Sequence, residues 1–283
     1  MGEVSFVNGQ LVAPDDAHVS VADRGLLFGD GLYEIIRVYG GRPFQLNAHV
    51  ERLGWGARKI GFELGVSLDS LRHACLDTLA ANESKEATIR LIVTRGDFAD
   101  PQRVSATAKP SVIVTCDEFT GYPDSFYDRG VDVVNVIDGR SDLAMINTLN
   151  CLPNVMAKKE AEAKRAFEAL LVTKKGFVMS GSQSNVFAVL DGILLTPPVG
   201  ERVPPGITRE AVLEIVRREG ISCREDAILN DEIGDAEEMF LTGTLMEVMP
   251  VVAIDGRPVG HGAPGNQTAR IIKAFKLMAR GAY

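Results

Sequence analysis

Three short turn sequences constrain the fold most strongly, because each joins two apolar runs through only two residues. They are Asn8-Gly9, Asp191-Gly192 and Asp255-Gly256. A two-residue hairpin loop of the common type needs positive φ at both central positions, and Asn-Gly and Asp-Gly adopt that conformation readily. The sequence therefore predicts three antiparallel hairpins, one near each end of the chain and one in its second half.

Five stretches with apolar residues at helical spacing separate the predicted strands. They cover residues 47–62, 67–82, 153–166, 206–220 and 267–279. Hairpins mixed with isolated helices indicate an α+β fold rather than a regular alternation of parallel strands and helices. Gly121 and Pro123 interrupt the pattern within residues 119–126, which predicts a boundary there. We expect an N-terminal α+β domain over residues 1–120 and a C-terminal α+β domain over residues 121–283.

Composition limits the classes of function that the chain can have. Of its 283 residues, 46% are hydrophobic, and the net charge of −8 argues against binding to nucleic acid or to an anionic membrane surface. The four cysteines lie far apart without a CxxC pair, so we expect neither a disulfide framework nor a metal site. We also find no signal peptide and no apolar segment of the roughly 18 residues that a membrane span needs. We expect a cytoplasmic protein with a small-molecule ligand.

Two segments have the residues of an anion-binding loop. Gly206, Ile207 and Thr208 begin a predicted helix, and the first N–H groups of a helix bind phosphate readily. Taken alone, Thr208 fits a simple helix cap better. Thr244 follows Gly243 at the end of an apolar strand, where small residues let backbone amides approach an anion. An ordinary turn after a strand has the same composition.

Arg52 and the polar run of residues 180–185 are two further candidates. Arg52 has the positive charge that a phosphate site needs, although an arginine on a helix is commonly solvated. Residues 180–185 lie between two apolar strands, and such runs allow a ligand to approach the backbone closely. Ordinary loops have the same composition, so none of these segments is decisive by itself.

The order of these segments resembles that of one enzyme family. The stretch "ADRGLLFGDGLYEIIRVYGGRPFQLNAHVERL" is similar to the opening of the fold-type IV pyridoxal-phosphate (PLP) enzymes, and "RLIVTRG", "SGSQSNVFAVLDGILLTPP", "GITREAV" and "MFLTGTLMEVMPV" follow in the family's order. The family comprises D-amino-acid aminotransferases, branched-chain aminotransferases and aminodeoxychorismate lyases, and the chain looks most similar to the first of these. The resemblance implies a two-domain fold, a cofactor pocket at the domain junction and assembly as a homodimer.

The resemblance also implies roles for individual residues. Tyr33 matches the tyrosine beside the cofactor ring, and Arg95 matches a common family arginine that we treat as a candidate substrate residue. The residues that hold the cofactor's phosphate in the family match four residues here: Arg52, Ile207, Thr208 and Thr244. By this resemblance, the phosphate-binding part of the family's site is retained.

At two positions that pyridoxal chemistry requires, the residue in this chain differs from the residue in the family. The Schiff-base lysine falls at Asn147, and an amide neither bonds covalently to PLP nor accepts a proton from the substrate. The glutamate that pairs with the pyridine nitrogen falls at Ser180, whose hydroxyl is neutral. Loss of the lysine alone would fit a deliberate substitution, whereas two losses with the same chemical purpose indicate divergence from ordinary transamination.

Three functions are compatible with this pattern. In the first, which we expect, the protein is an enzyme that acts on a small molecule in the old cofactor pocket without a covalent PLP Schiff base. Asn147 would then orient the substrate or Cys151 would act as a nucleophile, although a buried core thiol is the simpler interpretation of Cys151. In the second, an aminotransferase or lyase holds PLP or pyridoxamine phosphate (PMP) non-covalently. In the third, the protein binds a phosphorylated metabolite without catalysis.

Overall fold

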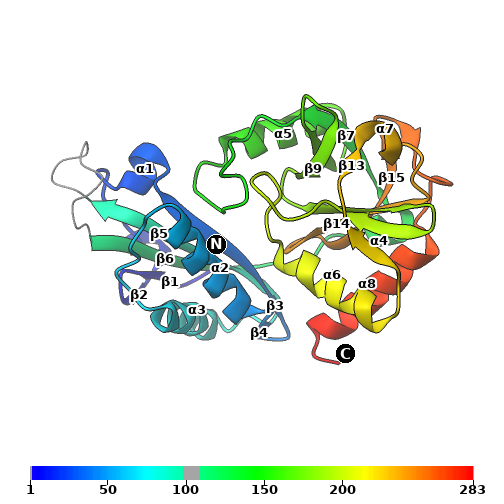
Figure 1. Ribbon diagram of the computed structural model, residues 1–283. Coiled ribbons are helices and arrows are strands. Elements are labelled where there is room, and N and C mark those ends of the chain that lie inside the picture. Colours follow the sequence, from blue (N-terminus) through cyan, green and yellow to red (C-terminus); the bar gives the residue numbers. More distant parts are fainter. Residues whose placement is uncertain (1, 98–108, 283) are drawn as a thin grey trace. The chain divides into compact units, whose positions relative to one another are not determined.

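The computed structural model describes residues 2–97 and 109–282, which form two compact units (Figure 1). The first unit contains Met1–Thr120 and Ile146–Asn150, and the second contains Gly121–Met145 and Cys151–Tyr283. The chain therefore passes between the units three times. Each unit combines a sheet with helices, as predicted for an α+β protein. No helix within the described residues is long and apolar enough to cross a membrane.

The first unit is an antiparallel sheet covered by two long helices. The strands follow the order β2-β1-β6-β5-β3-β4. Their bounds are β1 Ser5–Val7, β2 Gln10–Val12, β3 Gly31–Tyr39, β4 Arg42–Pro43, β5 Ala87–Asp97 and β6 Lys109–Glu118, and the helices are η1 Pro14–Asp16, α1 Arg24–Phe28, α2 Leu46–Lys59 and α3 Leu68–Asn82. Helix α2 packs against β3, and α3 packs against β6. Between them lies a core in which Ile36, Val50 and Leu91 are fully buried.

The second unit is a ten-stranded mixed sheet with helices around it. Its main strand order is β12-β11-β10-β14-β15-β7-β8-β9-β13, with β16 paired to β15. The strands are β7 Val131–Ile137, β8 Glu168–Val172, β9 Phe177–Gly181, β10 Asn185–Leu190, β11 Ile193–Thr196, β12 Cys223–Glu225, β13 Ile228–Leu229, β14 Glu238–Gly243, β15 Glu247–Ile254 and β16 Arg257–Pro258. The helices are α4 Asp124–Arg129, α5 Leu152–Ala163, α6 Ile207–Arg218, α7 Asn230–Ile233 and α8 Asn266–Ala279.

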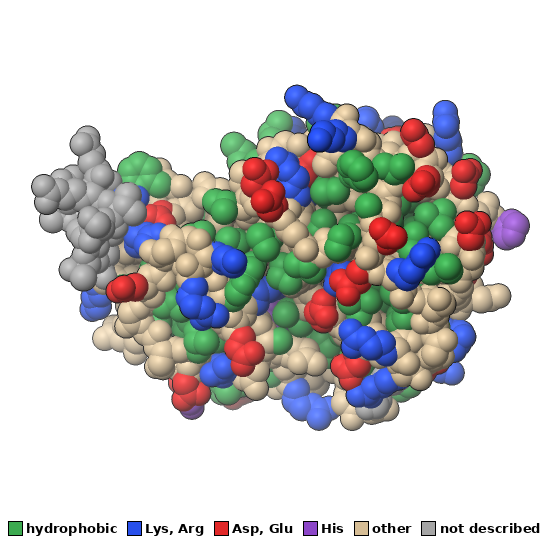
Figure 2. Space-filling view, viewed as in Figure 1, with side chains coloured by type: hydrophobic (Ala, Val, Ile, Leu, Met, Phe, Trp, Pro, Cys, Tyr) green, Lys and Arg blue, Asp and Glu red, His purple; other side chains and the backbone are tan. Residues whose placement is uncertain are grey.

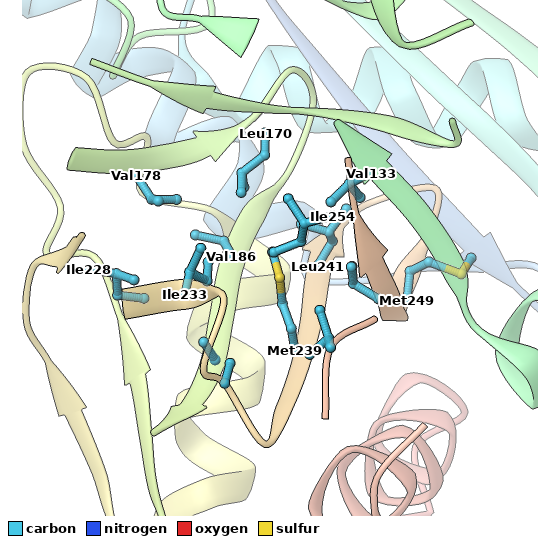
Figure 3. Packing of buried hydrophobic residues seen from close by; sticks show 14 of the residues in the cluster. Val133, Leu170, Val178, Val186, Ile228, Ile233, Met239, Leu241, Met249 and Ile254 are labelled. Carbon is cyan, nitrogen blue, oxygen red and sulfur yellow. The ribbon is translucent and has the colours of Figure 1, made fainter. Parts of the chain in front are cut away.

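A large apolar core packs within the second unit. Figure 3 shows side chains from β7, β8, β9, β10, β14 and β15 pointing toward one another. Val133, Val178, Val186, Leu241 and Met249 are among these fully or almost fully buried residues. Burial of side chains of this size contributes about 1.5–3 kcal/mol each, so this core fixes the strand ends that carry the candidate site residues.

The three predicted hairpins are confirmed. Both residues of each turn have positive φ: 50° and 98° at Asn8-Gly9, 51° and 73° at Asp191-Gly192, and 50° and 77° at Asp255-Gly256. The flanking strands pair directly across each two-residue turn, in β1–β2, β10–β11 and β15–β16. The five predicted helices are also present, as α2, α3, α5, α6 and α8, with ends that differ from the predicted bounds by up to three residues.

The short segment Ile146–Asn150 joins the first unit by pairing with β3. The N–H of Tyr33 donates to the carbonyl of Asn147 at 2.9 Å, and the N–H of Leu149 donates to the carbonyl of Gly31 at 3.0 Å. Leu32 and Thr148 form the antiparallel bridge between these two bonds. This pairing fixes residue 147 at the edge of β3, next to the residues described below.

Candidate functional site

A buried carboxylate, Glu34, organises the polar residues of the first unit. Glu34 lies on β3 and is 1% exposed. Arg52 binds it through two atoms, with Nε 2.9 Å from Oε1 and Nη2 2.6 Å from Oε2. The Nδ1 atom of His49 lies 2.7 Å from Oε2. His49 and Arg52 are three residues apart on α2, so both side chains project from one face of the helix toward β3.

The protonation states of this cluster follow from its contacts. Burial alone would raise the pKa of Glu34, but the charge of Arg52 and the hydrogen bonds from His49 and Arg52 outweigh burial, and that pKa is lowered. Burial lowers the pKa of His49, and this effect exceeds the opposing influence of the Glu34 carboxylate. At neutral pH the cluster therefore contains an anionic Glu34, a cationic Arg52 and a neutral His49 that donates Nδ1–H to Glu34.

Asn147 lies against the same carboxylate. Its Nδ2 atom is 3.5 Å from Glu34 Oε1, a long contact at the limit of hydrogen bonding. Tyr33 belongs to the same group of residues, since its N–H binds the Asn147 carbonyl. Burial lowers the pKa of Arg52, but Glu34 and, more weakly, Tyr33 raise it above its ordinary value. The first unit thus brings together three of the residues selected from the sequence, namely Tyr33, Arg52 and Asn147.

Arg95 has a different environment, in which its guanidinium is occupied by protein groups. Its Nε lies 3.0 Å from both carboxylate oxygens of Asp30, and its Nη1 donates to the carbonyl of Gly61 at 3.0 Å. The guanidinium also lies over the ring of Phe62, 4.8 Å from the centroid. These contacts tie β5 to the loops around it, and they give no support to a substrate role for Arg95.

In the second unit, the N-terminus of α6 is a candidate anion cradle. Gly206 is the N-cap residue, and no side chain caps the helix, so its first amides are available to an external acceptor. Thr208 therefore does not cap α6; it is buried in the first turn. A Cβ atom on Gly206 would lie 2.0 Å from Asn185 Oδ1, and Asn185 Nδ2 donates to the carbonyl of Pro204 at 2.9 Å. Asn185 thus holds the loop that enters the helix.

The end of β14 lies next to this cradle. Asn185 is paired in register with Thr242, which brings residues 242–244 toward the entrance of α6. A Cβ on Gly243 would lie 3.2 Å from the carbonyl of Gln183, so the strand end packs closely there. The hydroxyl of Thr242 is buried without a hydrogen-bond partner among the residues that the structure describes. The two phosphate-binding segments expected from the sequence are therefore neighbours within one unit.

Ser180 and Cys151 both belong to the second unit, where their environments differ. Ser180 lies on β9 with no exposed surface, and its hydroxyl donates to the carbonyl of Gly181 at 2.9 Å. It offers a ligand neither a charge nor a free proton. Cys151 is half-buried at the N-cap position of α5, in the second unit, whereas His49 belongs to the first. Nothing in this placement identifies Cys151 as an activated nucleophile.

The sequence did not reveal the residues that support these positions. Glu34 and His49 orient the first-unit cluster, and the one sequence signal for Glu34 is an acidic residue in the mostly apolar strand "GLYEIIRV". In the second unit, the buried Glu168 accepts from the hydroxyl of Ser182 at 2.5 Å, and Asn154 Nδ2 donates to the Ser182 carbonyl at 2.5 Å. These two contacts hold the loop that follows Ser180.

The residues fit one part of PLP and not another. The uncapped α6 helix, the close glycines and the buried Thr242 hydroxyl suit a phosphate group. The amide of Asn147 provides no amine for covalent attachment, and Ser180 provides no carboxylate for a pyridinium nitrogen. Retention of a phosphate-bearing ligand is consistent with these residues, and covalent attachment of PLP is not.

Comparison with known proteins identifies several with the same sequence pattern and fold. Residues 31–254 match the family described as amino-transferase class IV. The chain is 35% identical to a putative branched-chain-amino-acid aminotransferase of Methanocaldococcus jannaschii, covering 96% of this chain and 94% of that protein. It is also 35% identical to the D-alanine aminotransferase of Bacillus licheniformis, covering 95% and 94%. A solved branched-chain amino acid aminotransferase of Escherichia coli matches with a TM-score of 0.90 at 28% identity, over 100% of this chain and 96% of that one.

Proposed function

The chain belongs to the class IV aminotransferase family, and from this premise we propose that it is an enzyme of the family that acts on a small molecule without a covalent Schiff base to PLP. The observation that carries the proposal is Asn147. An amide, held beside the anionic Glu34, stands where the resemblance places the lysine. The resemblance to the fold-type IV PLP enzymes is itself confirmed by the family match and by the fold of the solved relatives.

No neighbouring residue of the first-unit cluster replaces the lysine. Covalently bound PLP supplies an electron sink for carbanions, and its use requires an amine and a base at the reacting carbon. Glu34 has a lowered pKa and is bound by Arg52, so it is a weak base. Asn147 is left as a polar group that binds and orients a ligand. In the second unit, the uncapped start of α6 with Ile207 and Thr208, together with Thr244 after β14, would hold a phosphate group. Arg52, which the resemblance matches to a phosphate-binding residue, binds Glu34 in the first unit.

A second function is favoured by the retained cradle, namely an aminotransferase or lyase that holds PLP or PMP non-covalently. An absorption spectrum separates the two functions. The protein is incubated with PLP, desalted and compared with its Asn147→Lys variant. After reduction with borohydride, we expect peptide mass spectrometry to find no cofactor attached at residue 147 in the wild type and cofactor attached at that position in the variant. Transamination by the wild-type protein at the rate of an ordinary aminotransferase would refute the proposal, and a cofactor-dependent slow turnover would favour the second function.

A third function is binding of a phosphorylated metabolite without catalysis. The cradle fits this function as well, because phosphate binding by itself requires no reactive group. Screening the protein for hydrolysis and isomerisation of phosphorylated small molecules, without added cofactor, distinguishes it from the first function. An activity that survives removal of all pyridoxal compounds supports the enzyme, whereas tight binding with no turnover supports the binding protein.

We expect Gly206→Ala to weaken binding of PMP by about 10-fold or more, the effect of losing one hydrogen bond to a charged group. The new methyl group would lie 2.0 Å from Asn185 Oδ1 and would displace the side chain that holds the helix entrance. Isothermal titration with PMP measures the change. Gly139→Ala is the matched control, because a Cβ at Gly139 meets nothing within 4 Å. Equal affinity of the two variants would exclude α6 from the binding site.

We infer that the protein forms a homodimer through apolar side chains around α1. Val21, Leu26 and Phe28 are 81%, 69% and 52% exposed, and hydrophobic side chains are visible over α1 in Figure 2. Such a group within eight residues is unusual for a monomer surface and typical of an interface. We expect Leu26→Glu to shift the protein from dimer to monomer in size-exclusion chromatography with light scattering. Val66→Glu, at a partly exposed residue outside this group, should leave the mass unchanged.

A further inference from the structure

The Glu34 carboxylate determines which way the amide of Asn147 faces. Both Glu34 oxygens already accept charged or strong donors: Arg52 Nε on Oε1, and His49 Nδ1 and Arg52 Nη2 on Oε2. With its pKa lowered and its surface buried, Glu34 is an anion that only accepts hydrogen bonds. A group placed against Oε1 must therefore present a donor.

Asn147 is that neighbouring group. Its backbone is fixed by the hydrogen bond from the Tyr33 N–H, and its side-chain nitrogen lies 3.5 Å from Glu34 Oε1. The opposite orientation would place the amide oxygen against the carboxylate, where two acceptors repel each other. The NH2 group consequently faces Glu34, and Oδ1 faces away from it. For the side chain of Asn147, the contact of Nδ2 with Glu34 is the one hydrogen bond to a described residue, and Asn147 is half-buried rather than enclosed.

We propose that Asn147 Oδ1 accepts a hydrogen bond from the ligand. The protein would therefore select a ligand with an amine or a hydroxyl group at this position, where the lysine of the family reacts with a carbonyl group. This inference rests on the proposed function and deepens it, because it names the chemistry of the ligand at residue 147. A carbonyl oxygen at that position would meet the amide oxygen of Asn147 and find no donor.

This selection can be tested with three probes. They differ only in the group on the carbon atom to which the family's lysine bonds. PMP carries an ammonium group there, pyridoxine 5'-phosphate a hydroxyl and PLP an aldehyde. We expect the first two to bind about 10-fold more tightly than PLP, the effect of one hydrogen bond relative to an unpaired acceptor. The PLP value is measured by displacement of PMP, because PLP also reacts with surface lysines. If PMP alone binds more tightly than PLP, the donor is an ammonium group. If PMP and pyridoxine 5'-phosphate both bind more tightly than PLP, either an ammonium or a hydroxyl group serves as the donor. Binding of PLP equal to or tighter than both overturns the inference.

Matched variants connect the preference with Asn147. Asn147→Leu keeps the size of the side chain and removes its oxygen, so we expect it to bind all three probes with similar affinity. Asn150→Leu removes an amide three residues away, which donates to the carbonyl of Gly29 and does not contact Glu34, and should keep the wild-type order. Persistence of the order in Asn147→Leu would show that another residue selects the ligand.

The orientation of the amide can also be measured without a ligand, which separates this inference from the proposed function. In NMR spectra of protein labelled with ¹⁵N-asparagine, the side-chain NH2 signals of Asn147 should shift in Glu34→Gln and, in the wild type, as Glu34 becomes protonated in acid. Failure of all three probes to bind would overturn the selection inferred for Asn147 and would leave the proposed cofactor-independent activity standing. Asn147 NH2 signals that respond to neither change would overturn the inference, whatever the probes do.

Discussion

Glu34→Gln is expected to lower the free energy of unfolding by about 3–5 kcal/mol, the usual cost of leaving one partner of a buried ion pair uncompensated. Glu34 is 1% exposed and holds both Arg52 and His49, so the variant leaves a buried guanidinium without a counter-charge. Urea denaturation followed by circular dichroism measures the loss. Glu34 on β3 binds two residues of α2, so its loss weakens the contact between this strand and this helix. The whole first unit should therefore unfold at a lower urea concentration.

A control on the same helix separates burial from the mere loss of a charge. Glu51 is exposed and its carboxylate lies 3.5 Å from Arg72, so Glu51→Gln should cost less than about 1 kcal/mol, as exposed ion pairs do. Similar losses for the two variants would mean that Glu34 is not an anion in the folded protein. The orientation inferred for Asn147 would then lose its physical basis as well.

The same cluster makes stability depend on pH in a defined direction. The folded pKa values of His49 and Glu34 both lie below their ordinary values of 6.5 and 4.5. A group with a depressed folded pKa stabilises the protein above its unfolded pKa and loses that contribution as the pH falls. The free energy of unfolding should therefore decrease below about pH 6.5 through His49, and decrease further below about pH 4.5 through Glu34. In His49→Gln the first decrease should disappear, and its persistence would assign it to another group.

The second large effect is expected from restoring both lost groups. Asn147→Lys/Ser180→Glu should bind PLP covalently and raise transaminase turnover by about 100-fold or more over the wild type, since general acid–base catalysis alone contributes about 10²–10⁴-fold. Asn147→Lys by itself should gain much less, because the hydroxyl of Ser180 cannot stabilise a pyridinium. D-alanine and a 2-oxo acid are the test substrates, because one relative is a D-alanine aminotransferase. A borohydride-reduced cofactor detected by mass spectrometry reports attachment independently of activity.

Glu34 should make this attachment dependent on pH. A lysine at position 147 would place its ammonium group near the carboxylate that now lies 3.5 Å from Asn147 Nδ2. An adjacent anion favours the protonated amine, which does not react with an aldehyde, so attachment should increase as the pH rises above neutrality. Attachment that is complete at pH 6 would show that Glu34 does not contact the new lysine. The control is Asn150→Lys/Ser180→Glu, which carries the same charges with the lysine displaced.

The local elements could be predicted from the sequence because their signals are local. Asn8-Gly9 and its two counterparts determine hairpins through backbone conformation alone, and the apolar spacing of α6 and α8 determines helices. The start of α6 was also predictable, since Gly206 and Thr208 are close together in the chain. Long-range pairing was not. Asn185 joins the α6 entrance to β14 by pairing with Thr242, and the sequence contains no signal for that register.

The buried ionic cluster was missed for a related reason. Arg52 alone suggested an anion-binding arginine, and no sequence pattern indicated that Glu34, eighteen residues earlier, would bind it. Arg95 was selected as a candidate substrate residue, and in the structure it binds Asp30 and the carbonyl of Gly61. Charged side chains of these types occur both in sites and in supporting contacts, and only their partners distinguish the two roles.

The pairing of Ile146–Asn150 with β3 has a consequence for dissecting the protein. One cut between Thr120 and Gly121 would not release two independent fragments, because the N-terminal piece would lack the segment that binds the N–H of Tyr33. Fragments 1–120 and 121–283, expressed separately, should instead recognise each other by β-strand complementation. The chain is thus suited to use as a split protein, in which reassembly restores residue 147 beside Glu34.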